Sequence, residues 1–353
     1  MWNHSQYPKK TPMEPDNLNI FYYCLLAFCT LFAGCLGSFS NVVIYRVPKH
    51  MSIAWPPSTC PKCGSRIKPY DNIPVLSWLI LRGKCRKCKN PISIQYPIIE
   101  FICAVFGFFL CRQIFEPNLN HLLQDGVFWR LFVLFAGQLI FLVGCLALAV
   151  IDYQTTEIPP EVALPIAALG IVVAFVLPET WPYMMVLGNI EWKDAILGAL
   201  IGGGMIAAII GLYYLATKRI GMGGGDIWMM IMVGAFLGWQ SLIFVLLAAS
   251  LQGIIIALAA IALGKKTQQT ETQQGLFRNQ VADEVQAEVD KNKETESTGD
   301  SANTDKDYED VSTGKLAVPF GPFIALAAIE YVFFGKYLLP LMTGGTLTPW
   351  GLM

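Results

Sequence analysis

Eight long apolar stretches restrict what this chain can fold into. They lie near residues 19–44, 94–111, 127–151, 161–178, 194–216, 226–239, 241–263 and 318–342. A helix needs about 20 apolar residues to cross the hydrocarbon core of a bilayer. Only 14% of the residues are charged, whereas soluble domains carry about 25%. The sequence therefore predicts an all-α polytopic membrane protein with about eight transmembrane helices, of which 226–239 is short or tilted.

The distribution of positive charge predicts the orientation of these helices. Residues 45–90 contain ten Lys or Arg and a single acid, Asp71. Loops rich in Lys and Arg stay on the cytoplasmic side of a membrane, so we expect this segment to be cytoplasmic. Alternation of the helices then places the N- and C-termini outside. The first apolar run is too long for a cleaved signal peptide, and we expect it to remain as an anchor.

These observations divide the chain into six predicted regions. They are an extracytoplasmic tail (1–18), the first transmembrane helix (19–44), a cytoplasmic module (45–93), helices two to seven (94–263), an acidic cytoplasmic loop (264–317), and the last helix with its tail (318–353). The loop is expected to be disordered because it has too few apolar residues to offset the entropy of ordering. The expected partners include membrane lipid, and no nucleic acid.

Four of the ten cysteines stand apart in the basic segment. Cys60, Cys63, Cys85 and Cys88 form the pattern C-x2-C-x21-C-x2-C. Two such pairs can present four thiolates to one tetrahedral zinc ion. A module of this size builds little core, and a structural metal is a common way to stabilise one. The pattern predicts a small zinc-ribbon-like module.

Other interpretations of the cysteines are weaker. A redox dithiol lacks the flanking thioredoxin-like pattern, and the cytoplasmic placement disfavours disulfides. Catalytic zinc is disfavoured because four thiolates leave no open coordination position.

Two aspartates are the candidate catalytic residues. Asp152 follows the apolar run that ends at Ile151, and Asp226 closes the glycine-rich segment 221–226. Both are expected at the cytoplasmic ends of different helices, at matching depth, and acids at such positions are functional candidates. Two adjacent carboxylates that share a proton can act as base and acid in peptide hydrolysis. Gly223 and Gly225 would let a substrate backbone approach closely.

Structural interpretations of the aspartates stay open at this point. Asp152 could be an ordinary interfacial acid, and Asp226 could be a helix N-cap, a frequent role of aspartate. A phosphate-binding loop is disfavoured, because the segment lacks the terminal GK[ST] of a P-loop and follows no strand.

Several segments resemble type IV prepilin peptidases, a family of membrane aspartic proteases with a GxGD motif. They are residues 37–48, the two cysteine pairs, residues 71–79, Tyr96-Pro97 with Glu100, the Asp152 segment, Gly223-x-Gly225-Asp226, and residues 319–323, in the family's order. The resemblance covers nearly the whole chain. Trp228 and Pro160 depart from the family pattern, which often has Lys and Asp there.

The resemblance implies a function and a location. Asp152 and Asp226 would form the protease pair of an enzyme in the bacterial inner membrane. It would cleave the basic leader of prepilins or pseudopilins and methylate the new N-terminus from S-adenosylmethionine. The cysteine module would bind zinc and be linked with methylation. Two alternatives are a peptidase without methylation and a non-enzymatic assembly factor that uses the module for docking.

Overall fold

The computed structural model describes residues 15–60, 62–122, 126–177, 191–218, 223–262 and 319–342. The chain divides into two compact units, residues 1–250 with 320–353, and residues 251–319. All of the predicted acidic loop (264–317) and most of the N-terminal tail (1–18) lie outside the described residues. Their expected disorder and location stay predictions, as do the domain boundaries.

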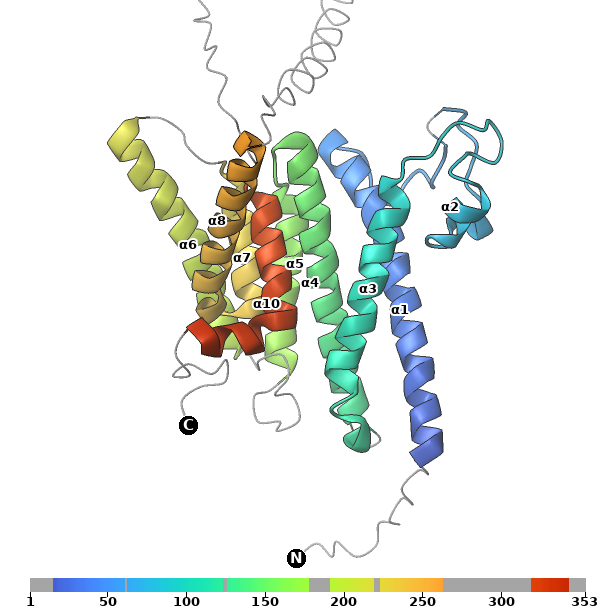
Figure 1. The fold of residues 1–353 in the computed structure, drawn as a ribbon, viewed down its shortest axis with the longest axis horizontal. Coiled ribbons are helices and arrows are strands. Elements are labelled where there is room, and N and C mark those ends of the chain that lie inside the picture. Colours follow the sequence, from blue (N-terminus) through green and yellow to red (C-terminus); the bar gives the residue numbers. More distant parts are fainter. Residues whose placement is uncertain are drawn as a thin grey trace, which may run out of the picture. The chain divides into compact units, whose positions relative to one another are not determined.

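All eight predicted apolar helices are present (Figure 1). They are α1 (Pro15–Arg46), α3 (Gln95–Phe115), α4 (Val127–Thr155), α5 (Pro160–Val176), α6 (Trp192–Thr217), α7 (Gly225–Leu237), α8 (Trp239–Ala262) and α10 (Gly321–Met342). Five of them are long and apolar enough to cross a membrane, while α5, α7 and the Gly321–Gly335 part of α10 are shorter apolar helices. The all-α membrane fold expected from the sequence is therefore confirmed.

Helices α1 and α3 pack together through small residues. A Cβ added to Gly37 of α1 would lie 2.8 Å from the Cβ of Cys103 in α3, and one added to Gly107 would lie 2.8 Å from the Cys29 carbonyl oxygen. Neither position has room for a side chain. Close backbone approach through small residues is the usual way in which helices associate in lipid.

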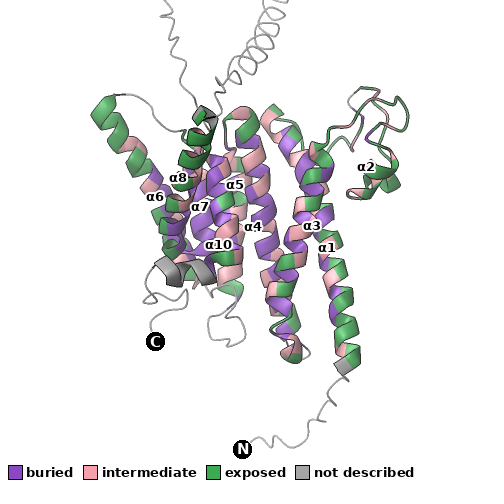
Figure 2. Cartoon of the chain, in the orientation of Figure 1, coloured by how far each residue is buried: buried purple, intermediate pink, exposed green. Residues whose placement is uncertain are grey.

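Helix α7 forms the centre of the second group of helices. It packs against α5, α6 and α10, and Figure 2 shows that it is largely buried. A Cβ at Gly198 or Gly202 of α6 would clash with the backbone of α7 at Gly234 and Met230, respectively. Helix α7 has 13 residues and a length of about 20 Å, so it is shorter than the bilayer core and its neighbours cover it.

The outward faces of the bundle are apolar. Large side chains such as Leu31 of α1, Phe101 of α3 and Leu200 of α6 are at least 60% exposed. A soluble protein rarely exposes so much contiguous apolar surface, so these faces are suited to contact with lipid.

The basic segment between α1 and α3 has little regular structure. It contains the short helices η2 (Val47–Lys49), η3 (Pro69–Asn72) and α2 (Leu76–Ile80), and two isolated antiparallel bridges, Thr59–Arg66 and Lys84–Pro91. One bridge accompanies each cysteine pair. We refer to residues 47–94 as the cysteine module.

The contact between α6 and α7 gives a test of this packing. A Gly234→Ala substitution should lower the free energy of unfolding by about 1–3 kcal/mol, because the added methyl group overpacks the interface. Gly204→Ala is the matched control, because a Cβ there meets nothing within 4 Å. Thermal unfolding in detergent should show a lower Tm for Gly234→Ala alone; equal Tm values for both variants would contradict the packing.

Candidate functional site

The two cysteine pairs adopt the same turn. In the first, the N–H of Gly64 donates to the Cys60 carbonyl oxygen (2.9 Å); in the second, the N–H of Lys89 donates to the Cys85 carbonyl oxygen (3.0 Å). Gly64 and Lys89 follow the second cysteine of each pair and both have positive φ, +64° and +59°. Glycine takes this conformation readily and lysine rarely does. The second turn is therefore maintained by its surroundings.

The four predicted cysteines come together. The Sγ atoms of Cys60, Cys63, Cys85 and Cys88 all lie within 4.8 Å of one another, and those of Cys60 and Cys88 are 3.8 Å apart. A tetrahedral zinc ion with Zn–S bonds of about 2.3 Å requires sulfur atoms about 3.8 Å apart. The cluster therefore has the donors and the dimensions for one zinc ion.

Ser65 supports the thiolate form of one ligand. The Ser65 Oγ lies 2.9 Å from the Cys63 Sγ. Hydrogen bonds from the Ser65 hydroxyl and backbone N–H lower the pKa of the Cys63 thiol to about 6. Because metals bind the thiolate, this partner favours metal binding at neutral pH.

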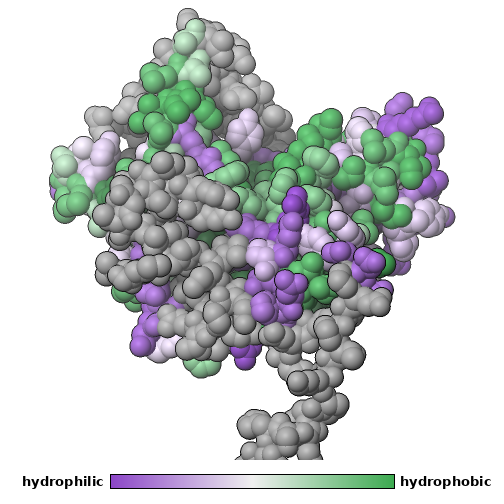
Figure 3. All heavy atoms as spheres, turned by 60° about the horizontal axis from the view of Figure 1, so that its bottom comes forward, coloured by the Kyte–Doolittle hydropathy of each residue, from purple (hydrophilic) through white to green (hydrophobic). Residues whose placement is uncertain are grey.

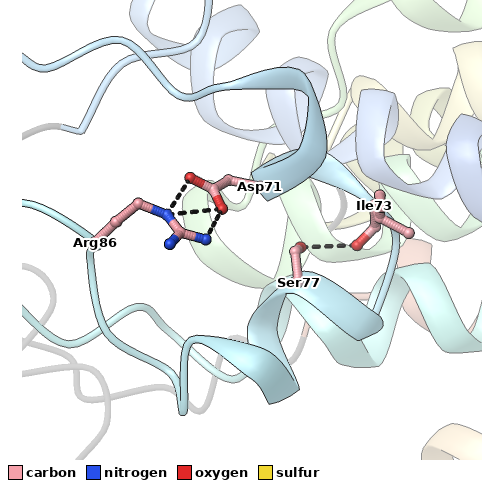
Figure 4. Close-up of polar contacts among 4 residues, drawn as sticks. All are labelled: Asp71, Ile73, Ser77 and Arg86. Carbon is pink, nitrogen blue, oxygen red and sulfur yellow. Dashed lines mark hydrogen bonds and ion pairs between the residues drawn. The ribbon is translucent and has the colours of Figure 1, made fainter.

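An ion pair connects the second cysteine pair to the segment before α2 (Figure 4). The Arg86 Nε donates to Asp71 Oδ2 at 2.8 Å, and the Arg86 guanidinium lowers the pKa of the Asp71 carboxyl. Farther along, the Ser77 hydroxyl donates to the Ile73 carbonyl oxygen at 2.7 Å. The cysteine cluster and the start of α2 are thus linked through residues 71–77.

Arg46 fixes the other side of the module. It is the last residue of α1 and is only 8% exposed. Its guanidinium donates to the carbonyl oxygens of Ser52 (2.9 Å), Ile53 (3.3 Å) and Pro56 (2.7 Å). These bonds hold the chain that leads to Cys60 against the end of α1.

The two predicted aspartates also lie at one place. Asp152 is in the last turn of α4 and Asp226 is the second residue of α7, and they are 5% and 6% exposed. Gly225, which directly precedes Asp226, and Gly321, whose added Cβ would clash with the Asp152 carboxylate, both pack against Ile158. The Asp152 Oδ2 accepts a hydrogen bond from the backbone N–H of Gly321, at the start of α10, at 2.9 Å. Three helix ends therefore meet around the two carboxylates.

Ile158 fills the space between these helix ends. A Cβ added to Gly225 would lie 2.9 Å from the Ile158 Cβ and 3.0 Å from its backbone nitrogen. One added to Gly321 would lie 2.9 Å from the Ile158 Cδ1 and would also clash with the Asp152 carboxylate. Gly225 and Gly321 therefore allow the three backbone segments to touch.

The structure decides one alternative for Asp226. The N-cap residue of α7 is Gly224, and no side chain caps the helix. The interpretation of Asp226 as a helix N-cap is therefore wrong. Its carboxylate is left for another role.

Gly223 differs from Gly225. Gly223 and Gly224 are exposed, and among the residues that the structure describes, a Cβ at either would meet nothing within 4 Å. Gly225 serves close packing, whereas the space beside Gly223 is open. A backbone from another molecule could approach there.

The two departures from the family pattern fit the local structure. Pro160 is the first residue of α5. At this position a backbone N–H would have no acceptor within the helix, so proline, which lacks the N–H, is tolerated. Trp228 packs against the apolar core from α7. Neither position removes a carboxylate from the site.

Sequence reasoning gave no role to Gly321 or Ile158. Gly321 lies 169 residues from Asp152 in the chain, so no local pattern connects them. The one available signal was the Pro319–Phe323 segment, which opens the last helix.

Comparison with known proteins identifies the family. The model described as "Bacterial Peptidase A24 N-terminal domain" matches residues 31–114, and "Type IV leader peptidase family" matches residues 139–258. A "Prepilin leader peptidase/N-methyltransferase" from Myxococcus xanthus is 32% identical over 88% of this chain and 92% of its own length. The chain belongs to the type IV leader peptidase family.

Other members of the family show the same identity over a smaller part of the chain. The proteins of the same name from Pseudomonas aeruginosa and Neisseria gonorrhoeae are each 32% identical, over 67% and 63% of this chain and 82% and 78% of their own lengths. No solved structure gives a significant match. The first family match contains the cysteine module, and the second contains Asp152 and Asp226. Both sites therefore lie within the family's domains.

The cysteine cluster leads to a prediction about metal content. The freshly reduced, purified protein should contain about one zinc per chain, because the cluster has four donors at tetrahedral spacing. Cys60→Ser should lose most of this zinc. Cys35→Ser is the control, since Cys35 is exposed on α1, outside the cluster. Elemental analysis that finds no zinc in the unmodified protein would rule out the metal site.

Proposed function

We propose that the chain is a membrane aspartic endopeptidase that removes the basic leader of type IV prepilins or pseudopilins and methylates the new N-terminus. The observation that carries the proposal is the meeting of Asp152 and Asp226, both buried, beside the Gly321 N–H. The 32% identity to prepilin leader peptidase/N-methyltransferases supports the substrate class.

Both aspartates have catalytic roles in this proposal. Two neighbouring carboxylates that share one proton provide a base and an acid together. The ionised member takes a proton from water, whose oxygen then attacks the scissile carbonyl carbon. The protonated member donates its proton to the carbonyl oxygen. A proton finally passes to the leaving nitrogen as the C–N bond breaks.

The Gly321 hydrogen bond suggests how the roles divide. A backbone N–H that donates to Asp152 Oδ2 stabilises a negative charge on that oxygen. Asp152 is therefore the better candidate for the base. Asp226, without a capping bond to its own helix, is the candidate for the acid.

The position of the aspartates fits a substrate that is half cytoplasmic and half membrane-embedded. A prepilin leader is basic and would stay in the cytoplasm, and the apolar helix that follows it would lie in the bilayer. The scissile bond would then fall at the interface. Because a helical carbonyl is hydrogen-bonded and screened from attack, the substrate must unwind there. Its extended backbone would lie beside Gly223, where space is open.

The cysteine module would contribute through zinc. Cys60, Cys63, Cys85 and Cys88 would hold the ion, which would fix the fold of residues that otherwise share little core. Four thiolates complete its coordination, so its role is structural. The methyl donor expected for the second reaction is S-adenosylmethionine.

The aspartates provide the first test of the proposed function. Asp152→Asn and Asp226→Asn should each lower the rate of leader cleavage by at least about a thousand-fold, because each removes half of a coupled acid–base cycle. The assay would use purified protein and a prepilin in detergent. Glu157→Gln is the control: Glu157 is a nearby exposed acid, and its loss should leave the rate unchanged.

The same assay separates the two reactions. Both aspartate variants should still methylate a pilin that lacks its leader. Cleavage at a normal rate by Asp226→Asn would overturn the aspartyl mechanism. If the unmodified protein did not methylate this pilin, the chain would be a peptidase without methyltransferase activity.

The glycines give a second test. Gly223→Val should raise KM for the prepilin without changing Tm, because the side chain enters the space assigned to the substrate. Gly211→Val is the control, because a Cβ at Gly211 also meets nothing within 4 Å. An unchanged KM in Gly223→Val would place the substrate elsewhere.

A further inference from the structure

Residues 74 and 75 of the cysteine module lie against the sides of the membrane helices, below their cytoplasmic ends. A Cβ added to Gly34 of α1 would lie 3.4 Å from the Pro74 Cβ and 3.8 Å from the Ala104 Cβ of α3. The backbone N–H of Val75 donates to the Oε2 of Glu100 at 2.7 Å. Residues 74 and 75 therefore contact α1 and α3 together.

The contact positions give the depth of this segment. Helix α3 has 21 residues, so its length of about 31 Å matches the hydrocarbon core of about 30 Å. Its first residue, Gln95, therefore lies near the cytoplasmic surface of the core. Glu100 and Ala104 lie about 8 and 13 Å deeper along the helix. The Pro74–Val75 contact thus falls at the depth of the cytoplasmic leaflet.

The short helix α2 follows this contact and turns its apolar side outward. Ile73, Leu76, Leu79 and Ile80 are 45%, 54%, 57% and 72% exposed. Within α2, the spacing of three and four residues places Leu76, Leu79 and Ile80 on one face, and Ile73 lies in the extended segment just before the helix. Trp78 points the other way, since its indole packs at Gly83 and donates to the Ile92 carbonyl oxygen at 3.2 Å. Figure 2 shows the exposure of α2.

Two observations indicate what covers this apolar face. Ile98 and Phe101 of α3 are 47% and 60% exposed, and its N-cap residue Ile94 is 61% exposed, so α3 carries its own lipid-facing side chains. Around α2, the module contains many basic residues and the single acid Asp71, which Arg86 already pairs. Figure 3, which brings the lower side of the molecule forward, shows hydrophobic residues beside strongly hydrophilic ones in the module at the right.

We propose that residues 73–80 insert into the cytoplasmic leaflet and that Arg82 and Lys84, which follow α2 and are exposed, bind anionic lipid headgroups. An apolar face with a basic surround is the composition of segments that lie in a membrane interface. Arg82, exposed just after α2, can extend its charged group to the headgroups while its stem stays in the apolar layer. The module is then a membrane-embedded element, held between α1 and α3 by Pro74 and the Glu100 hydrogen bond.

The test uses the full chain in nanodiscs of phosphatidylethanolamine and phosphatidylglycerol. A fluorescent amino acid is placed singly at position 80, at position 101 as the lipid-facing reference, and at position 62 as the solvent reference, since Lys62 is exposed on the first cysteine turn. Quenching is measured with lipids brominated on their acyl chains and with aqueous iodide. Zinc content shows that each labelled protein has kept its module.

Position 80 should behave like position 101, with several-fold stronger quenching by brominated lipid than at position 62 and weak quenching by iodide. Replacing phosphatidylglycerol with a zwitterionic lipid should increase iodide quenching at position 80 but not at position 101. Iodide access at position 80 equal to that at position 62 would overturn the proposal. Protection from both quenchers would also overturn it, because the face would then be covered by protein.

Discussion

The contact between Gly225, Ile158 and Gly321 is the constraint on which the aspartate site depends. Ile158 lies between two glycines that have no room for a Cβ. Through this contact the end of α4, the start of α7 and the start of α10 meet. They contribute Asp152, Asp226 and the Gly321 N–H, respectively. If a larger side chain separated them, Asp152 would lose the Gly321 N–H and its proximity to Asp226.

The position of Asp226 depends also on how α7 is buried. A helix of 13 residues does not span a bilayer by itself. Helix α7 is covered by α5, α6 and α10, and the glycines of α6 let the two backbones approach closely. Its N-terminus, which carries Asp226, is thereby fixed at the level where α4 ends and Asp152 lies. From its sequence alone, α7 was a marginal transmembrane helix because it is short; its central position means that neighbouring helices cover it.

Much of the fold was predictable because a bilayer demands long apolar segments, and all eight expected helices exist. The cysteine cluster was predictable from its spacing, and so was the meeting of the helix ends that carry Asp152 and Asp226, from their matching depth; the catalytic role of the two aspartates stays a prediction. The Gly321 hydrogen bond was not predictable, because it joins residues 169 positions apart. The placement of α2 was hidden for a similar reason. It depends on the contact of Pro74 with Gly34 and on the hydrogen bond from Val75 to Glu100. A helix of five residues is too short for a sequence periodicity that would predict these contacts.

The most direct test of the aspartate pair is a double-mutant cycle on leader cleavage. The kcat/KM of a purified prepilin would be measured for the unmodified protein, Asp152→Asn, Asp226→Asn and the double variant. Carboxylates that act as one unit are non-additive, so the double variant should be no slower than either single variant. Independent, multiplying effects, or near-normal cleavage by either single variant, would contradict a shared acid–base role.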